Sequence, residues 1–311
     1  MISRAQKILL ECMDVKQSET VLVITDDSTE EIGNIFYMAS AGISCESLLM
    51  KMKDRKCAGQ EPPQAIAEAM KYADVVLCPT KMSLTHTNAR IEALKAGARI
   101  ATLPGIDMEL FEAGALQADY IQIEERSEQI AGYLTAAERA VLIKDQYRLE
   151  FGLGGRRGIA STGRYRRPGS CGNLPSGEAY IAPVETEVNG SMLIDGSMVG
   201  IGVLEEPVLV EINSGEFTNL CDTLFQKIEV LNGLAANRIV AELGIGTNDK
   251  ARLTGNILED EKVMGTVHIA FGTNTSFGGV NKAECHLDGV IVNPTLWLDD
   301  KLILDRGVLM V

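Results

Sequence analysis

Short apolar runs alternate with helix-like patterns along residues 1–128. Residues 21–24 are all branched aliphatic residues, and the Asp26-Asp27-Ser28 sequence that follows is typical of a strand leading into a capped helix. The alternation continues: it predicts strands at 43–49, 74–78 and 98–102, and helices at 65–72 and 88–96. Strands and helices at this spacing predict an α/β N-terminal domain with a small parallel sheet and helices on both faces.

The pattern changes twice further along the chain. Residues 126–150 carry apolar side chains at helical spacing, including Ile130, Leu134 and Val141, and we expect a linking helix over 129–150. Over 151–311 glycine becomes frequent and short apolar runs are separated by turn residues, which predicts a β-rich α+β domain. The expected elements are strands at 179–181, 191–194, 208–212, 239–241, 266–271, 289–292, 296–298, 302–304 and 307–311, and one helix at 219–231.

Charge and composition narrow the classes of function. The 311 residues are 46% hydrophobic, and 29 Lys and Arg against 43 Asp and Glu give a formal net charge of −14. A surface this acidic repels a phosphate backbone, so we expect no nucleic-acid partner. No stretch approaches the roughly 18 uninterrupted apolar residues of a spanning helix, so we expect no membrane partner either.

Cysteine usage indicates a reducing compartment. The seven cysteines are odd in number and form no C-x-x-C pair, which is typical of buried thiols rather than of disulfides or a zinc knuckle. The N-terminal residues lead directly into an amphipathic segment without the apolar core of a signal peptide. We therefore expect a cytoplasmic protein.

Two of the three histidines of the chain lie within 19 residues of each other, at His268 and His286. On a strand, His286 and Asp288 project from the same face, so both can reach one metal ion. His268 lies in an apolar, glycine-bounded run that also suggests a strand. Two imidazoles and a carboxylate are a donor set for a catalytic metal site with open positions. The alternative is that these are unrelated, hydrogen-bonded histidines.

Acidic residues among apolar and glycine neighbours add to this pattern. Glu178 follows a Pro-Ser-Gly sequence, and Glu242 lies in an apolar run that ends in Gly-Ile-Gly. A carboxylate in an apolar strand is costly unless it is paired or binds a cation. Glu261 closes an acidic triplet upstream of His268, and this triplet is either part of the same site or a solvated turn.

Taken in order, these segments resemble the aminopeptidase T family, a group of metallopeptidases in the same superfamily as the 2,5-dihydroxypyridine 5,6-dioxygenases. The resemblance covers the second half of the chain well and extends to the segment at 83–87. It is carried by the series Asn173-Leu174-Pro175-Ser176-Gly177-Glu178, Glu242-Leu243-Gly244-Ile245-Gly246-Thr247-Asn248, Asp260-Glu261-Lys262, His268 and His286-Leu287-Asp288.

The two branches of the superfamily imply different metal centres. The peptidase members imply a two-metal centre (Zn, Co or Mn) that activates water, with Glu178 or Glu242 as bridging ligand or general base. The ligands implied are Glu178, Glu242, Glu261, His268, His286 and Asp288. The dioxygenase members imply a single Fe(II) held by His268, His286 and Asp288 as a facial triad, with O₂ and substrate in the remaining positions. The family resemblance also implies a homodimer.

Two further segments suggest substrate contacts. His86 follows a predicted strand, where open α/β sheets place ligand-binding loops, and the dioxygenase relatives imply a catalytic, proton-transferring role for it. A surface or capping role is the alternative. Arg156 and Arg157 begin a cluster of five arginines that would bind a substrate carboxylate bidentately or pair with acidic residues of a partner subunit. The alternative is that these arginines belong to a solvated linker between the domains and have no function.

Three hypotheses of function follow. The first is a metal-dependent aminopeptidase-like hydrolase that cleaves N-terminal residues or a small amide. The second is an Fe(II)-dependent ring-cleaving dioxygenase of a hydroxylated N-heterocycle, and the third is a non-catalytic protein that binds a small molecule. The substrate is accordingly a peptide or a small molecule.

Overall fold

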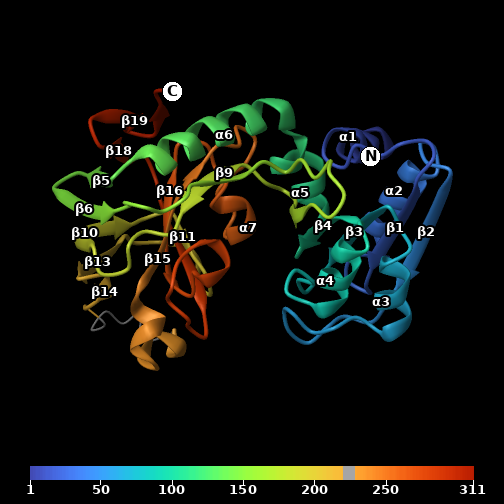
Figure 1. Ribbon diagram of the computed structural model, residues 1–311, viewed down its shortest axis with the longest axis horizontal. Helices are drawn as coiled ribbons and strands as arrows, with labels where there is room; N and C mark the ends of the chain where they lie inside the picture. Colours follow the sequence, from blue (N-terminus) through green and yellow to red (C-terminus); the bar gives the residue numbers. More distant parts are fainter. Residues whose placement is uncertain (220–227) are drawn as a thin grey trace. The chain divides into compact units, whose positions relative to one another are not determined.

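The computed structural model describes residues 1–219 and 228–311, which form two compact units (Figure 1). The first unit comprises Met1–Ile121 and Gly163–Ser176, and the second comprises Gln122–Thr162 and Gly177–Val311. This division differs from the expected boundaries at 128 and 151, because the segment Gly163–Ser176 adds an edge strand to the sheet of the first unit.

The first unit is the predicted α/β domain. Its strands are all parallel and have the order β2-β1-β3-β4-β8. They span Thr20–Thr25 (β1), Glu46–Lys51 (β2), Val75–Thr80 (β3), Arg99–Pro104 (β4) and Cys171–Asn173 (β8). The central strands are buried on both faces, as parallel strands between helices must be.

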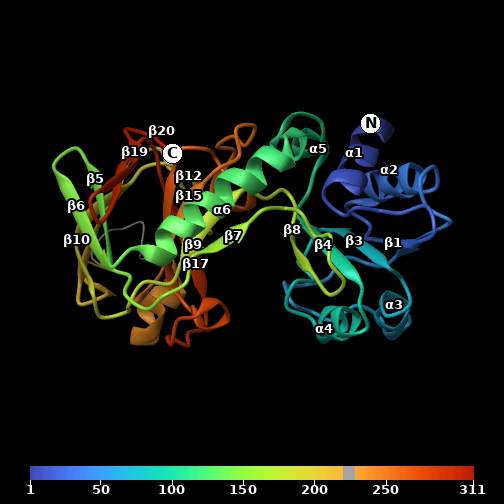
Figure 2. The ribbon, with the colours of Figure 1, turned by 45° about the horizontal axis from the view of Figure 1, so that its top comes forward.

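Helices cover both faces of this sheet, with α1 and α2 on one side and α3 and α4 on the other (Figure 2). They span Ile2–Glu11 (α1), Glu30–Ser40 (α2), Gln64–Met70 (α3), Asn88–Lys95 (α4) and Met108–Ala113 (α5), followed by the 3-10 turn Ala115–Gln117 (η1). Thr87 caps α4 by accepting a hydrogen bond from the Arg90 N–H. The strand and helix predictions for this half are confirmed to within a few residues.

The second unit is built from two antiparallel sheets. The site sheet, defined here by the order β12-β11-β17-β16-β15-β9-β7, packs against a supporting sheet of order β14-β13-β10-β6-β5-β18-β19-β20. The site sheet comprises Ile159–Ser161 (β7), Glu178–Ile181 (β9), Ser197–Met198 (β11), Gly202–Val203 (β12), Val240–Gly246 (β15), Val267–Gly272 (β16) and His286–Ile291 (β17). The supporting sheet comprises Arg139–Lys144 (β5), Tyr147–Gly152 (β6), Val188–Ile194 (β10), Val208–Asn213 (β13), Glu216–Phe217 (β14), Thr295–Leu298 (β18), Lys301–Asp305 (β19) and Val308–Leu309 (β20).

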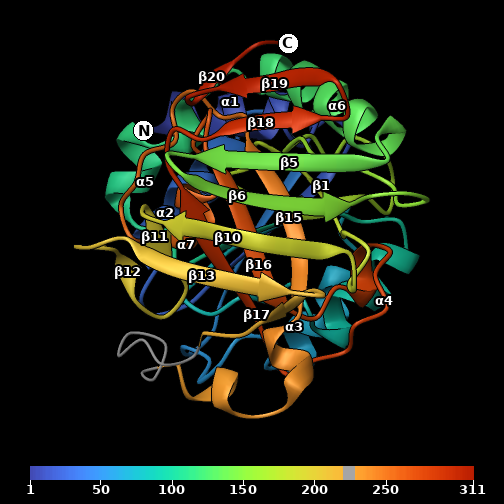
Figure 3. The same ribbon diagram turned by 90° about the vertical axis from the view of Figure 1, so that its left-hand side faces the viewer.

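Strands of the supporting sheet cross those of the site sheet, as Figure 3 shows for β5, β6 and β10 in front of β15 and β16. The hydrophobic core of the unit lies between the sheets and takes side chains from both, for example Leu142 and Val210 from one and Ile269 and Phe271 from the other. Helix α6 (Tyr120–Ala136) adds its own apolar side chains to the same core. Short helical turns occur at Glu229–Asn232 (η3), Ala235–Arg238 (η4), Ile257–Asp260 (α7) and Thr275–Phe277 (η5).

The prediction of a linking helix over 129–150 is wrong beyond Ala136. Residues 139–152 form a β-hairpin, β5 to β6, whose turn carries Asp145 at a left-handed φ of 52°. The continuous apolar run Ala140–Ile143 does not distinguish a helix from a strand by its period, and the pairing of β5 with β18 makes it a strand. The helix expected over 219–231 falls largely on residues 220–227, which lie outside the described residues.

Within the described residues, no helix is long and apolar enough to cross a bilayer.

Truncating Phe271 tests the core between the two sheets. This ring is fully buried and lies 5.3 Å from the Phe217 ring centroid. We expect Phe271→Ala to lower the free energy of unfolding by about 3–5 kcal/mol, because it removes a large apolar side chain and leaves a cavity. Val308→Ala, at a 62% exposed position of the same unit, is the control. Equal denaturant midpoints for the two variants would contradict this account of the core.

Candidate metal centre

The candidate ligands project from one face of the site sheet. Strand pairing sets His268 opposite Gly244 and Asp288 opposite Ala270, and His286 lies two residues before Asp288 on β17. Directly paired residues and residues two apart project from the same face of a sheet, so these side chains share one. The positions between them point to the opposite face and belong to the core: Ala179, Ile181, Leu243, Ile245, Val267, Ile269, Phe271 and Leu287.

A β-bulge brings Glu242 onto the same face. Val240 pairs with Phe271 on the core side, but Glu242 pairs with Ala270 because the register shifts between them. Without the extra residue, Glu242 would point into the apolar core. Glu178 reaches the same face from the neighbouring strand β9.

Glycine makes room for the imidazole of His268. A Cβ atom on Gly244 would lie 2.0 Å from His268 Nε2, well inside van der Waals contact. Gly246 has a related function, since a Cβ there would lie 2.0 Å from the carbonyl oxygen of Val263. The Gly-Ile-Gly sequence therefore allows both the histidine ring and the following segment to approach β15 closely.

The segment between β15 and β16 supplies two more charged side chains, Glu261 and Lys262, at the end of α7. Asp260, their neighbour, is fully buried and accepts hydrogen bonds from the N–H groups of Thr254 (2.7 Å) and Gly255 (3.0 Å). Glu259 is also buried, and it accepts a hydrogen bond from the backbone N–H of Arg252. The alternative of a solvated acidic turn is therefore wrong. Of the triplet, only Glu261 belongs to the cluster of charged side chains on this face, which comprises Glu178, Glu242, Glu261, Lys262, His268, His286 and Asp288.

The candidate ligands contact one another at short range. Nε2 of His268 lies 3.3 Å from Oε2 of Glu178 and 3.3 Å from Oε1 of Glu242. Nε2 of His286 lies 3.3 Å from the other oxygen of Glu242 and 3.5 Å from Oδ1 of Asp288. Glu242 thus stands between the two imidazoles.

The sequence predicts no role for Lys262, yet its ammonium lies among the side chains of this cluster. Its side chain is only 3% exposed, and its Nζ donates to Glu178 Oε1 at 2.7 Å and to Glu261 Oε1. The signal available in the sequence was a lysine directly following the acidic triplet. Burial opposes the charge, but Glu178 and Glu261 outweigh it and raise the pKa of Lys262, so the ammonium stays charged.

Hydrogen bonds assign different roles to the two histidines. Nδ1 of His286 donates to the Thr273 carbonyl oxygen at 2.8 Å, so Nε2 is the ring nitrogen that faces Glu242 and Asp288 and would bind a metal ion. Burial lowers the pKa of His286, but these two carboxylates outweigh it and raise the pKa well above its usual value. Nδ1 of His268 is buried and has no hydrogen-bond partner among the described residues. Nε2 of His268 faces the carboxylates of Glu178 and Glu242, so this nitrogen carries the proton that donates toward them.

Burial and neighbouring charges shift the acidities of this cluster. Burial raises the pKa of Glu242, but hydrogen bonds from His268 and His286 outweigh it and lower the pKa to about 2. Burial together with the charges of Glu178 and Asp288 raises the pKa of Glu261 to about 7, despite Lys262. For His268, burial lowers the pKa, but the carboxylates, Glu242 foremost, raise it to about 9. These pKa shifts are typical of a site with an excess of carboxylates, in which a nearby positive charge is stabilised.

Three sets of side chains bring their ligand atoms within 4.8 Å of one another: Glu178, Glu242 and His268; Glu242, His286 and Asp288; and Glu261, His268 and Asp288. The expected triad of His268, His286 and Asp288 is not among these sets in the part of the chain described here. The donors are carboxylate oxygens and imidazole nitrogens, which suit a divalent transition metal.

The segment between β16 and β17 covers the His286 side of the cluster. Phe277 packs edge-on against His286 (ring centroids 5.9 Å apart) and against Tyr180 (5.4 Å). Glu185 fixes this segment by accepting hydrogen bonds from the side chain of Asn274 (2.9 Å) and the N–H of Val280 (2.7 Å).

Arg156 and Arg157 are not members of the cluster, and His86 belongs to the other unit. Arg156 forms an ion pair with Glu185 and donates to the Gly278 carbonyl oxygen at 2.6 Å, so it helps to hold the covering segment. Arg157 is exposed. His86 is an exposed residue of the first unit, between β3 and α4. Their expected roles toward substrate remain predictions.

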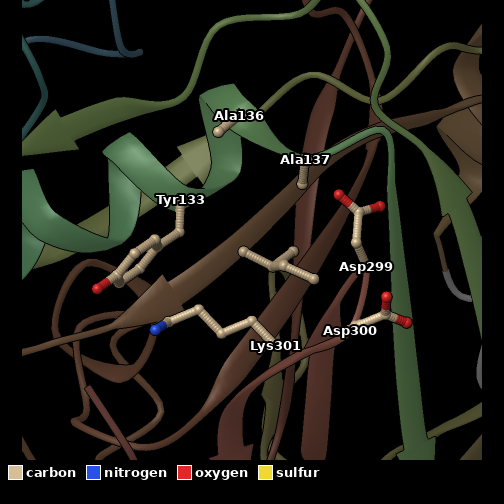
Figure 4. A pocket seen from close by; sticks show the side chains of 7 residues that line it. Tyr133, Ala136, Ala137, Asp299, Asp300 and Lys301 are labelled. Atoms are coloured by element: carbon tan, nitrogen blue, oxygen red, sulfur yellow. The ribbon is translucent and has the colours of Figure 1, made fainter.

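A shallow surface cavity lies elsewhere on the second unit (Figure 4). Its lining includes Tyr133, Asp299 and Lys301, and the Lys301 ammonium lies 4.3 Å from the centroid of the Tyr133 ring. None of the candidate ligands lines it.

Comparisons with known proteins identify one family and a shared fold. The 2,5-dihydroxypyridine 5,6-dioxygenase family, NicX, matches residues 1–311. A curated 2,5-dihydroxypyridine 5,6-dioxygenase of Pseudomonas putida KT2440 is 25% identical over 267 residues, which cover 78% of this chain and 73% of that protein. The solved structure of 2,5-dihydroxypyridine dioxygenase from P. putida KT2440 is similar, with a TM-score of 0.82 at 18% identity over 100% of this chain and 96% of the other. Wild-type AmpT from Thermus thermophilus aligns with a TM-score of 0.72 at 16% identity, covering 100% and 98% of the two chains.

Gly244→Ala tests the packing of the cluster. The new methyl group would occupy the place of the His268 ring, so we expect the ring to be displaced and its contacts with the carboxylates to be lost. Divalent-metal affinity, measured by isothermal titration calorimetry, should fall at least about tenfold, as it does when a partner that orients a metal ligand is removed. Gly132→Ala in α6, where nothing lies within 4 Å, is the matched control and should bind metal normally. Unchanged affinity in a folded Gly244→Ala protein would contradict the described packing.

Proposed function

Because this chain belongs to the 2,5-dihydroxypyridine 5,6-dioxygenase (NicX) family, we propose that it is an Fe(II)-dependent ring-cleaving dioxygenase of a hydroxylated N-heterocycle. The chain is an enzyme, and its relatives include the dioxygenase of P. putida. The observation that carries the proposal is the family match over the whole chain, together with a buried cluster of imidazoles and carboxylates on one sheet face. The substrate is a small molecule of the 2,5-dihydroxypyridine type.

We assign the iron to Glu242, His286 and Asp288. Their ligand atoms already lie together, and Nδ1 of His286 is held by the Thr273 carbonyl oxygen so that Nε2 faces the two carboxylates. His268, the remaining member of the expected facial triad, lies 3.3 Å from the carboxylate of Glu242 and stays a predicted ligand. Iron bound here would supply the site that activates O₂ and orients the substrate oxygen, as in non-haem oxygenases.

The residues around the cluster determine how a substrate is received. The Thr273 carbonyl oxygen fixes the ring orientation of His286, and Phe277 with Tyr180 forms an aromatic wall beside it. A flat heterocycle can pack against such a wall, which also excludes water from the reacting oxygen. The homodimer expected from the family resemblance stays a prediction.

The aminopeptidase-like hydrolase is a second candidate because of one observation. Two of the ligand sets share Glu242, as a carboxylate bridging two metal ions would. The similarity to AmpT is below 25% identity and supports the fold alone. The two candidates differ in the number of metal ions, one for the dioxygenase and two for the hydrolase.

Replacing a proposed ligand tests the iron site. We expect His286→Ala and Asp288→Ala to lose iron and the O₂-dependent consumption of 2,5-dihydroxypyridine, because each change removes a metal ligand. Iron content by elemental analysis and oxygen uptake with an electrode measure the two effects. Asp300→Ala, an exposed acidic residue of the same unit, is the matched control and should keep both.

The decisive result concerns the wild-type protein. Purified under anaerobic conditions with Fe(II), it should consume one O₂ per heterocycle, because a dioxygenase inserts both oxygen atoms into its substrate. Release of an N-terminal residue from peptides with Zn, Co or Mn, without any oxygen uptake on hydroxylated pyridines, would refute the dioxygenase and support the hydrolase.

A further inference from the structure

Tyr180 projects from the same sheet face as the candidate ligands. It lies two residues after Glu178 on β9 and therefore points the same way. Strand pairing sets Tyr180 and His268 opposite Gly244, one from each neighbouring strand. Because the ring of His268 occupies the space that Gly244 leaves, the side chain of Tyr180 borders the cluster on the β9 side. Burial, and then the charges of Glu178 and Glu242, raise the pKa of Tyr180, so its hydroxyl lies within electrostatic reach of the cluster.

Phe277 holds the aromatic ring of Tyr180 at this border. The two rings meet edge-on with their centroids 5.4 Å apart, and Phe277 contacts the ring of His286 in the same way at 5.9 Å. One phenyl ring thus links Tyr180 to a proposed metal ligand. Edge-on contacts of this kind are favourable in themselves, so the ring of Tyr180 has a defined position beside the site.

The hydroxyl of Tyr180 has no hydrogen-bond partner among the described residues. Other tyrosines of the chain differ in this respect. The hydroxyl of Tyr165 donates to the carbonyl oxygen of Asn173 at 2.6 Å. That of Tyr133 accepts from the side-chain amide of Gln129 at 3.2 Å. Because a partly buried tyrosine hydroxyl usually finds a partner, Tyr180 has a donor available on the site face for a molecule that binds there.

The substrate class named above carries a matching acceptor. In 2,5-dihydroxypyridine the two oxygens lie at opposite ends of the ring, so only one of them can approach the ligands of a single ion. We propose that the hydroxyl of Tyr180 donates a hydrogen bond to the other oxygen, the one remote from the metal ligands. A phenol keeps its proton at neutral pH and donates well to a hydroxyl or an oxyanion.

Tyr180 thereby selects heterocycles with two oxygens over those with one. It is a specificity-determining residue that contacts the substrate and does not bind the metal. This inference rests on the proposed function, and it identifies the feature of the substrate that the β9 side of the site recognises.

Ligand binding in the absence of oxygen tests the proposal. The Fe(II)-loaded full-length protein is titrated anaerobically with 2,5-dihydroxypyridine, 2-hydroxypyridine and 3-hydroxypyridine, and Kd is measured by isothermal titration calorimetry. Each monohydroxy compound lacks one of the two oxygens, so one of them keeps the oxygen near the metal ligands and lacks the acceptor for Tyr180. We expect the wild-type protein to bind the dihydroxy compound more tightly than either of them.

Tyr180→Phe removes the hydroxyl and keeps the ring that Phe277 contacts. The dihydroxy compound should bind this variant about tenfold more weakly, which is the size of one hydrogen bond. The tighter-binding monohydroxy compound should be affected by less than about twofold, because it makes no bond to the missing group. Iron content by elemental analysis should equal that of the wild-type protein.

Tyr133→Phe is the matched control, since it removes a hydroxyl from the same unit beside the surface cavity of Figure 4. It should bind all three compounds as the wild-type protein does. An unchanged Kd for the dihydroxy compound in a folded Tyr180→Phe protein would overturn the proposal. So would equal weakening for all three compounds, which indicates lost packing, or loss of iron, which indicates a metal ligand. If the variant fails to fold, a wild-type protein that binds a monohydroxy compound as tightly as the dihydroxy compound overturns it.

The outcome for Tyr180 is separable from the outcome for the dioxygenase. A wild-type protein that binds the dihydroxy compound through Tyr180 but never consumes oxygen would refute the proposed reaction and leave the role of Tyr180 intact. Oxygen consumption with 2,5-dihydroxypyridine, together with unchanged binding to Tyr180→Phe, would do the reverse. A wild-type protein that binds none of the three compounds would refute both.

Discussion

Buried charge of one sign is the constraint on which the second unit depends. The site sheet carries carboxylates at positions that are almost closed to water. Burying one isolated carboxylate costs more free energy than the net free energy of unfolding of a typical domain. The structure offsets this cost with imidazole and ammonium partners at hydrogen-bonding range. The remaining excess of negative charge is what a divalent metal would neutralise, so stability and metal binding are coupled through the same groups.

Local backbone features make this arrangement possible. A bulge in β15 turns Glu242 away from the core, and Gly244 leaves the space that the His268 ring fills. The opposite face of the same strands packs against the supporting sheet, which fixes the strands that present the ligands. The rigid apolar side of the sheet therefore holds the polar side in position, as a preorganised site requires.

The fold is shared between enzymes of different chemistry, so the reaction must be decided by side chains rather than by topology. In this chain the deciding contrast lies between two ligand sets that share Glu242. One contains Glu178, which accepts a hydrogen bond from Lys262, and the other contains His286, whose Nδ1 donates to the Thr273 carbonyl oxygen.

The sequence by itself determined the class of each half and most of the candidate ligands. Apolar periodicity predicted the strands and helices of the first unit, because each buried element leaves its own period in the chain. The i, i+2 spacing of His286 and Asp288 placed them on one face, because strand geometry is local. Tertiary structure alone decided the rest. The hairpin at 139–152 depends on its pairing with β18 and β10, and the roles of Glu242, His268 and Lys262 depend on a register shift and on contacts between residues up to 84 positions apart. Such contacts leave no period in the sequence, since they arise only when separate strands are brought together.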